Sequence, residues 1–264
     1  MMIVTTGGRY NEHSLQKAKD IAIRYKLNFV MRKKRSVKEL RERYNDDVLV
    51  VGRDGISITP LTGNESVKYH PNFSMVRAKR LLKNEHDALV EAAELTAGMS
   101  FLDCTMGLGA DSVIASLTVG NSGRVTALED SLILYLLTKE GLSSYDANIG
   151  VISDAMKNVE VLHEDHETYL KTLADNSFDI VYFDPMFEEE ISNSESLRAI
   201  SAVTQSKTLS ETAINEAKRV AAKTVVLKDH FRSRRFEQFG FIQQIRKTSK
   251  VHYGVINTET EVDS

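Results

Sequence analysis

The stretch Phe101-Leu102-Asp103-Cys104-Thr105-Met106-Gly107-Leu108-Gly109-Ala110-Asp111-Ser112 decides the fold class. An apolar run ends in an acid, Asp103, and a Gly-x-Gly turn then leads into a segment that suits a helix. Glycines let the backbone pass close to a bulky ligand, and a helix N-terminus offers N–H groups that lack partners within the helix. The stretch therefore predicts a strand, a turn and a helix, with a ligand beside Asp103, Gly107 and Gly109.

The chemistry of this turn narrows the kind of ligand. A dinucleotide fingerprint would have a third glycine near position 112, where the chain has Ser112. The Asp103 carboxylate would also repel a pyrophosphate, whereas it suits a cation or an amine. A tight turn without any ligand is the plainer interpretation of a lone Gly-x-Gly, and the motifs that follow disfavour it.

Strand-like and helix-like segments alternate from Met99 onward, which predicts a mostly parallel sheet with helices on both faces. Ligands of such sheets bind beyond the carboxyl ends of the strands. We expect strands near 101–105, 125–129, 159–163, 179–183, 223–228, 240–246 and 252–257, and helices near 110–119, 131–142, 148–157 and 208–222.

The remainder of the chain predicts a smaller unit in front of this sheet. Residues 1–60 alternate short strands and helices, and a hairpin is expected over 48–58, which indicates a small α/β subdomain. Residues 61–98 are expected to form a linker, with helices near 74–82 and 84–96, and 99–264 to form the main domain.

Composition excludes several classes of protein. The 264 residues are 42% hydrophobic and 27% charged, the balance of an ordinary globular protein. The single cysteine, Cys104, excludes an internal disulfide and any zinc site that needs two cysteines. Neither a signal peptide nor an uninterrupted apolar run of membrane-spanning length is evident, so we expect a cytoplasmic protein without a membrane partner.

Charge is distributed unevenly along the chain. Residues 1–98 carry 18 Lys/Arg and 12 Asp/Glu, a net charge of +6, whereas residues 99–264 carry a net charge of −9. This asymmetry favours an anionic partner for the first third of the chain, although a solvated basic surface would give the same pattern.

Acids follow two further predicted strands. Glu129 ends the strand that comes about 20 residues after the Gly-rich turn, the position at which Rossmann-like sheets bind a ribose. Its alternative role is to cap the helix that begins at Ser131. Asp165 follows the next strand and could accept an adenine amine. His163 and His166 lie nearby without an evident third ligand, so we predict no metal site.

The stretch Phe178-Asp179-Ile180-Val181-Tyr182-Phe183-Asp184-Pro185-Met186-Phe187 is a strong candidate for chemistry. Pro185 donates no N–H, so the Asp184 carboxylate and a nearby backbone carbonyl can accept both N–H groups of a flat amine. Phe187 can stack on the ring that carries this amine. An ordinary strand-to-loop turn, with Phe187 in the core, is the alternative.

Basic residues occur in two stretches that could contact phosphates. A predicted strand ends in Lys228, and a cationic cluster follows it to Arg235. Residues 68–80 are also rich in Lys, Arg and His. We predict RNA contacts through 68–80 and 228–235, with solvated basic loops as the alternative.

Three blocks together resemble a known family. Asp-x-Thr-x-Gly-Leu-Gly-x-Asp at 103–111, Asp-Pro-Met-Phe at 184–187 and Val-Val-x-Lys at 225–228 are similar to blocks of class I S-adenosylmethionine-dependent methyltransferases. More narrowly, they resemble the small-subunit ribosomal RNA guanine-N2 methyltransferases typified by RsmJ. The resemblance covers about 60–257 and implies a Rossmann-like domain with a seven-stranded, mostly parallel sheet.

The resemblance also implies roles for single residues. Cofactor contacts would come from Asp103, Thr105, Gly107, Gly109, Ala110, Asp111, Glu129, Asp130, Asp165, His166 and Asp184, and catalysis from Asp184, Pro185, Phe187 and Lys228. The expected cofactor is S-adenosylmethionine, and the expected reaction is methylation of an exocyclic base amine, guanine N2, in ribosomal RNA.

Other functions remain open at this point. The chain could methylate a protein amide or a small molecule, or it could be a non-catalytic RNA-binding module with a vestigial cofactor pocket. A nicotinamide-dependent oxidoreductase is disfavoured by Ser112 and Asp103. The sequence does not predict the oligomeric state.

Overall fold

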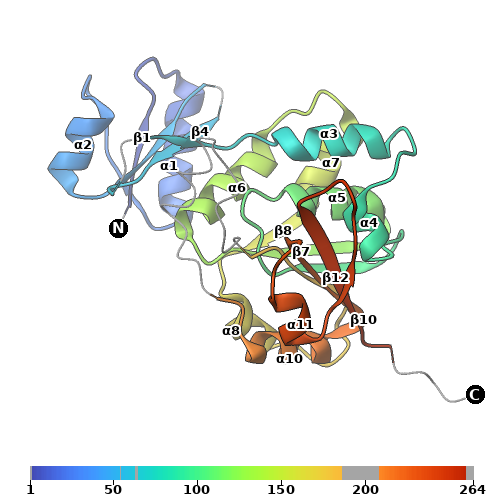
Figure 1. Ribbon diagram of the computed structural model, residues 1–264. Helices are drawn as coiled ribbons and strands as arrows, with labels where there is room; N and C mark the ends of the chain where they lie inside the picture. The colour runs from blue at the N-terminus through green and yellow to red at the C-terminus, as the bar shows by residue number, and fades with distance from the viewer. Residues whose placement is uncertain (1, 54, 63–64, 186–207, 260–264) are drawn as a thin grey trace, which may run out of the picture. The chain divides into compact units, whose positions relative to one another are not determined.

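The computed structural model describes residues 2–53, 55–62, 65–185 and 208–259. Its described residues form two compact units (Figure 1). The N-terminal unit contains residues up to His70 together with Leu136–Tyr145, and the larger unit contains the rest. Each unit has a sheet of its own.

The sheet of the N-terminal unit has five strands in the order β2-β1-β3-β4-β5. Strand β1 is parallel to its neighbours β2 and β3, and β4 and β5 extend the sheet in antiparallel pairs. The strands are β1 (Met2–Thr6), β2 (Asn28–Phe29), β3 (Asp47–Val51), β4 (Ile56–Thr59) and β5 (Val67–Lys68).

Two helices with clear start signals connect the parallel strands. Helix α1 (Glu12–Arg24) begins after Asn11, and helix α2 (Val37–Tyr44) begins after Ser36. Both starts are capping boxes, in which the cap side chain accepts the N–H of the third helical residue and that residue's side chain accepts the cap N–H. The helices and the hairpin predicted for this region are therefore confirmed, within a few residues at their ends.

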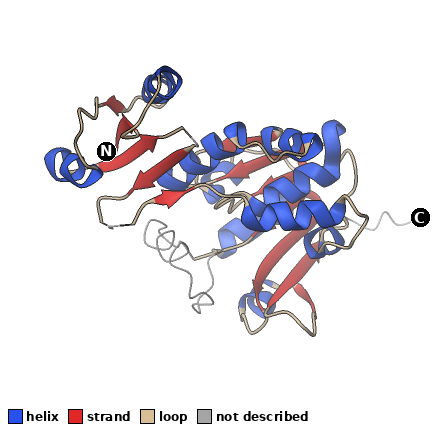
Figure 2. Ribbon diagram, turned by 90° about the horizontal axis from the view of Figure 1, so that it is seen from above, coloured by secondary structure: helices blue, strands red, loops and turns tan. Residues whose placement is uncertain are grey.

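The larger unit contains a seven-stranded sheet in the order β11-β12-β10-β9-β6-β7-β8. All its pairs are parallel except those of β12 with β10 and β11. This confirms the predicted seven-stranded, mostly parallel sheet. The strands, red in Figure 2, are β6 (Ser100–Asp103), β7 (Arg124–Leu128), β8 (Val159–Leu162), β9 (Phe178–Phe183), β10 (Ala221–His230), β11 (Ile242–Gln244) and β12 (Val251–Asn257).

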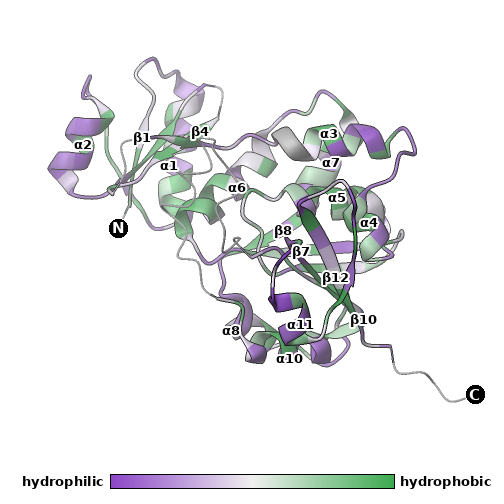
Figure 3. Ribbon diagram, in the orientation of Figure 1, coloured by the Kyte–Doolittle hydropathy of each residue, from purple (hydrophilic) through white to green (hydrophobic). Residues whose placement is uncertain are grey.

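Helices pack on both faces of this sheet. Helix α5 contacts α3, α4 and α7, whereas α10 packs with α8 against β9 and β10. Alternate side chains of β9 point to opposite faces of the sheet. Val181 and Phe183 belong to the hydrophobic core that includes α10, whereas the Tyr182 hydroxyl donates to Asp111 of α5. Apolar residues, green in Figure 3, accordingly follow the strands. The remaining helices are α3 (Asn72–Leu81), α4 (Ala88–Ala92), α5 (Ala110–Val119), α6 (Leu132–Ser144), α7 (Gly150–Lys157), α8 (His166–Leu170), α10 (Glu211–Val220) and α11 (Arg235–Phe239), with a 3₁₀ turn, η1 (Gly120–Ser122).

The division between the units and the extent of several elements differ from those predicted. Strand β5 pairs with β4, so the N-terminal sheet extends past residue 60, and the division between units falls after His70. Of the helix expected over 84–96, only α4 forms. It begins after its cap, Asp87, and it ends before Glu94, which adopts a left-handed backbone with φ of 47°. Two short helices, α8 and α11, were not predicted. Among the described residues, no helix is long and apolar enough to cross a bilayer.

Candidate active site

The turn between β6 and α5 has the conformation that its glycines make possible. Gly107 and Gly109 have φ angles of 55° and 73°, a left-handed region that favours glycine. The Met106 N–H donates to the Leu128 carbonyl at the end of β7, at 2.9 Å. Gly109 supplies no side chain to cap α5, so the first N–H groups of this helix are left for a ligand.

The Asp103 carboxylate holds this turn together. One oxygen accepts the Thr105 N–H at 3.0 Å and the other accepts the Ser112 hydroxyl at 2.5 Å. Ser112, whose presence argued against a dinucleotide site, therefore ties the helix start to the strand end. Burial raises the pKa of Asp103 to about 7, although the Ser112 and Thr105 bonds oppose that rise. Direct contact of Asp103 with the cofactor stays a prediction.

Glu129 combines the two roles that the sequence left open. Its carboxylate accepts the Gly107 N–H and the Ser131 N–H, each at 2.9 Å. The first bond brings Glu129 to the Gly-rich turn, and the second caps the start of the next helical segment. Burial raises the pKa of Glu129 to about 7, against the lowering effect of these two N–H donors.

The residues after β8 lie at the same carboxyl edge of the sheet. Asp165 caps α8 by accepting the N–H and the hydroxyl of Thr168, both at 2.9 Å. The His166 ring stands edge-on to Phe183 of β9. His163 lies 3.0 Å from the Asp130 carbonyl through Nε2. No group of three metal-ligating side chains comes together among the described residues.

A buried ionic cluster lies next to the turn, centred on Asp111 in the first turn of α5. The Asp111 carboxylate accepts bonds from Arg77, from the Tyr182 hydroxyl at 2.8 Å and from Lys228 Nζ at 2.9 Å. Arg77 also makes a bidentate pair with Asp87, at 2.7 and 2.8 Å. The protein itself therefore supplies three donors to the Asp111 carboxylate, and contact of Asp111 with the cofactor stays a prediction.

Lys228 connects this cluster to Asp184. Its ammonium lies 2.6 Å from Asp184 Oδ2, and among the described residues Oδ1 has no hydrogen-bond partner. The Asp184 N–H donates to Thr105 Oγ1 at 2.6 Å, so the end of β9 is fixed to the turn after β6. The Asp184 side chain is 25% exposed.

The charged groups of this cluster shift one another's pKa values. Burial alone would raise the pKa of Asp111, but Lys228 and Arg77 outweigh it and hold that pKa well below its usual range. Burial would lower the pKa of Lys228, and Asp111 and Asp184 raise it instead. The pKa of Asp184 is raised by burial and by Asp111, with Lys228 opposing them. Lys228 is therefore a permanent cation between two carboxylates.

The structure brings most of the predicted site residues to one edge of the sheet. Pro185 is buried directly after β9, and Phe187 lies outside the described residues. The sequence did not predict that Arg77, Asp87 and Tyr182 belong to the buried ionic cluster around Asp111. Alternation along β9 could have placed Tyr182 on the α5 face, but no local signal relates Arg77 to an acid 34 positions away.

The two predicted basic stretches are partly occupied by internal contacts. Arg77 and Lys228 belong to the ionic cluster, Arg80 pairs with Glu85 at 2.8 Å, and Arg235 lies 3.4 Å from Asp229. Lys68, Lys79, Arg232 and Arg234 are exposed and make no such pair with the residues that the structure describes. Contact of these residues with RNA stays a prediction.

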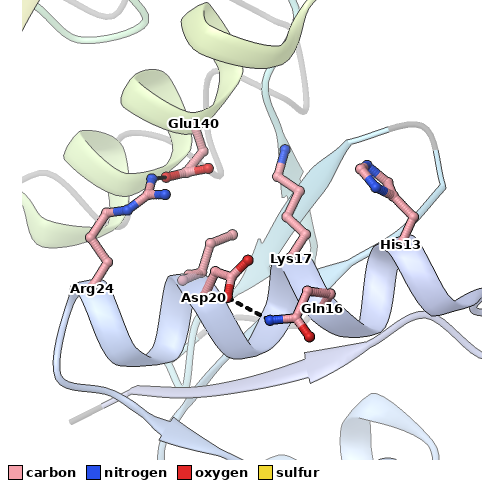
Figure 4. Close-up of a pocket in the computed structure, with 7 residues that line it drawn as sticks. His13, Gln16, Lys17, Asp20, Arg24 and Glu140 are labelled. Carbon is pink, nitrogen blue, oxygen red and sulfur yellow. Dashed lines mark hydrogen bonds and ion pairs between the residues drawn. The ribbon is translucent and has the colours of Figure 1, made fainter.

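Two cavities lie away from this edge. One of about 190 Å³ belongs to the N-terminal unit, between α1 and α6, where Arg24 Nη1 lies 2.8 Å from Glu140 Oε1 (Figure 4). The other, of about 570 Å³, adjoins Arg124 and Glu160 at the amino ends of β7 and β8. Since ligands of parallel sheets bind at the carboxyl ends, neither is assigned to the cofactor.

Comparison with known proteins identifies the family. Residues 35–252 match the family described as "Putative SAM-dependent methyltransferase". The chain belongs to this methyltransferase family. The methyltransferase is 41% identical over 256 residues to the uncharacterized protein YpiP of Bacillus subtilis, and the match covers 97% of this chain and 99% of that protein.

More distant relatives have named substrates. Ribosomal RNA small subunit methyltransferase J of Francisella tularensis subsp. novicida is 33% identical over 108 residues, which cover 40% of this chain and 42% of that protein. The corresponding protein of Acinetobacter baylyi is 27% identical over 146 residues, covering 53% and 50%. These matches therefore span half or less of the relatives' length.

A solved structure confirms the fold. The SAM-dependent methyltransferase NGO1261 from Neisseria gonorrhoeae superposes with a TM-score of 0.64 at 18% identity, covering 97% of this chain and 96% of that one. The family and the fold imply S-adenosylmethionine as the cofactor. The site suits it chemically, because uncapped helix N–H groups fit a carboxylate, and Glu129 and Asp165 can accept the ribose hydroxyls and the adenine amine.

Proposed function

We propose that this methyltransferase modifies an exocyclic amine of a base in ribosomal RNA, and specifically guanine N2, in the cytoplasm. The observation that carries the proposal is the placement of Asp184. One carboxylate oxygen is held by Lys228, the other has no hydrogen-bond partner within the part of the chain that the structure describes, and the backbone of the same residue is fixed to the turn after β6.

Asp184 suits an amine substrate for electronic reasons. The lone pair of an exocyclic amine is delocalised into the ring, so the nitrogen is a weak nucleophile. Accepting its two N–H groups at Asp184 Oδ1 and at a neighbouring carbonyl would favour the pyramidal, reactive form. Pro185 supplies no competing N–H at this position.

The residues around Asp184 have separate tasks in this proposal. S-adenosylmethionine, when bound, supplies an electrophilic methyl group on sulfonium. The Gly-rich turn, Glu129 and the α5 N-terminus would bind and orient it. The substrate nitrogen would take up this methyl group, S-adenosylhomocysteine would be the leaving group, and Asp184 Oδ1 could accept the proton that the nitrogen releases. Holding both reactants in line supplies much of the acceleration, roughly 7–11 kcal/mol for well-oriented groups.

RNA is favoured over the other substrates by two lines of support. The matched relatives from Francisella and Acinetobacter are named as ribosomal RNA methyltransferases. The first 98 residues also carry a net charge of +6, which suits a polyanion. A protein amide or a small molecule would not require this charge. A base within a helix must be unstacked or presented in a loop before it can reach Asp184.

The test is the Asp184→Ala variant, assayed with labelled S-adenosylmethionine on small ribosomal subunits from cells that lack this protein. We expect the label in RNA with the wild type, and a loss of at least about 100-fold in the variant because the amine loses its acceptor. Calorimetric titration with S-adenosylhomocysteine is the control and should give the same affinity for both proteins. Undiminished turnover by the variant would contradict the role of Asp184, and label found only in protein would contradict the substrate.

A further inference from the structure

The cations of the N-terminal unit gather at one edge of its sheet. Because β1 is parallel to β2 and β3, the loops that follow these three strands leave the sheet at the same edge. The Gly7 N–H donates to the Val51 carbonyl at 2.8 Å, so the first and third loops begin side by side. We call the cations of these loops the basic edge: Arg9, Lys33, Lys34, Arg35 and Arg53.

Arg32 fixes the middle loop of this edge. Its Nη1 donates to the Thr6 carbonyl at the end of β1, at 3.2 Å, and its Nε donates to the Arg35 carbonyl at 2.9 Å. Between these anchors Lys33 and Lys34 both adopt left-handed backbone conformations, with φ of 46° and 65°. Consecutive residues other than glycine rarely do so, and the clamped turn leaves both lysines exposed.

The cations of the basic edge form no ion pair with any residue that the structure describes. Among the described residues, no carboxylate oxygen lies within ion-pair distance of its five cations. Glu39 lies close enough to Arg35 to feel its charge, but the Glu39 carboxylate caps α2 through the Ser36 N–H. Elsewhere in the unit, Arg24 pairs with Glu140 at 2.8 Å and Lys38 with Glu42 at 3.9 Å. The edge therefore presents a positive potential to solvent.

The position of this edge is that of a ligand site in an open α/β sheet. Strand β1 lies between β2 and β3. Helix α1 leads from β1 to β2 and α2 leads from β2 past β1 to β3, so the two connections run in opposite directions along the sheet. Right-handed crossovers then place the two helices on opposite faces, and the carboxyl end of β1 becomes the topological switch point. Loops of three adjacent strands spread the cations over roughly 10 Å, which suits several phosphates better than one.

From these observations we infer that the basic edge binds the phosphate backbone of RNA. The inference rests on the proposed function, and it adds an RNA-binding surface to the predicted contacts at 68–80 and 228–235, several of whose cations serve the protein's own ion pairs. Phosphate contacts carry no sequence information, so this surface would supply affinity and orientation, while the site at Asp184 selects the base.

The test is the binding of a labelled small-subunit ribosomal RNA fragment at several salt concentrations. The Lys33→Glu/Lys34→Glu variant changes the charge of the basic edge. The matched control, Lys19→Glu/Lys26→Glu, makes the same change in net charge on exposed residues of α1 and of the turn that leads from α1 into β2. We expect the first variant to bind at least about tenfold more weakly than the control, with the slope of log affinity against log salt reduced by about two.

The outcomes separate this inference from the proposed function. Titration with S-adenosylhomocysteine and thermal unfolding establish that both variants are folded. If the wild type binds RNA and the edge variant binds it as well as the control does, the basic edge is not the RNA-binding surface, although RNA remains the substrate. If the edge variant binds naked RNA normally and fails only on assembled subunits, the edge contacts a protein and the inference is overturned. If the wild type neither binds nor methylates RNA, the proposed function itself fails.

Discussion

Asp184 and Lys228 form a charge pair at the centre of the proposed active site. Lys228 bonds Oδ2 of Asp184 at 2.6 Å and also contacts Asp111 at 2.9 Å. A buried carboxylate without this cation would take up a proton and lose an acceptor. Asp111 accepts a bond from the same ammonium and also binds Arg77, so Lys228 bridges the Asp184 carboxylate to the buried ionic cluster.

Glu129 leads to a prediction about pH. Its pKa is raised to about 7 by burial, and in the proposed site its charged form accepts the ribose hydroxyls. As the pH falls through 7, the carboxylate takes up a proton, so we expect affinity for S-adenosylhomocysteine to fall by up to about tenfold per pH unit. Calorimetric titration between pH 8 and pH 5.5 measures this. The Glu129→Gln variant should bind more weakly at pH 8 and vary little with pH, and an equally steep dependence in this variant would assign the titration to another group.

At the level of single residues, the sequence predicted where the acids of the site lie in the fold, but it did not predict their hydrogen-bond partners. The acid that ends β6 and the acids that follow β7, β8 and β9 all lie at one sheet edge, as their place at strand ends required. Their hydrogen bonds could not be read from the sequence, because Asp103 bonds to Ser112 and Asp111 bonds to Arg77 only after the chain has folded.

Helix α3 gives a prediction at the scale of elements. Arg77 pairs with Asp87 before α4 and with Asp111 in α5, so one side chain joins three elements. Replacing Arg77 with Met would leave two buried carboxylates without this partner, and we expect the free energy of unfolding to fall by about 3 kcal/mol. Denaturant unfolding at pH 7.5 measures the change.

The same helix contains the matched control. Arg80 pairs with Glu85 at 2.8 Å on the surface, where the two side chains are 56% and 45% exposed. Arg80→Met should therefore cost less than about 1 kcal/mol. Equal losses for the two variants would mean that the buried contacts of Arg77 do not stabilise the fold.

Regular elements were predictable where periodicity and end signals agree. Helix α5 was placed over its observed residues because Gly109 precedes it and an apolar strand precedes that turn. The helix expected over 84–96 is shorter in the structure, since Asp87 caps the start of α4 and Glu94 adopts a left-handed backbone. Strand β5 was missed because its two residues gain their stability from pairing with β4, which is a tertiary effect.

For the whole molecule, charge and chemistry are divided between the two units. The cofactor motifs and the ionic cluster belong to the larger unit, and the basic edge belongs to the N-terminal unit. The sequence predicted this division as a charge asymmetry. It did not predict which cations remain available, because ion pairs such as Arg77 with Asp87 form only in the folded chain.

The most direct test of the account is nucleoside mass spectrometry of small-subunit ribosomal RNA from cells with and without this protein. We predict that N2-methylguanosine falls by one residue per ribosome when the protein is absent. It should return with the wild-type protein and fail to return with Asp184→Ala. Unchanged nucleosides in the absence of the protein would contradict ribosomal RNA as the substrate, and the loss of a different methylated nucleoside would contradict guanine N2 as the acceptor.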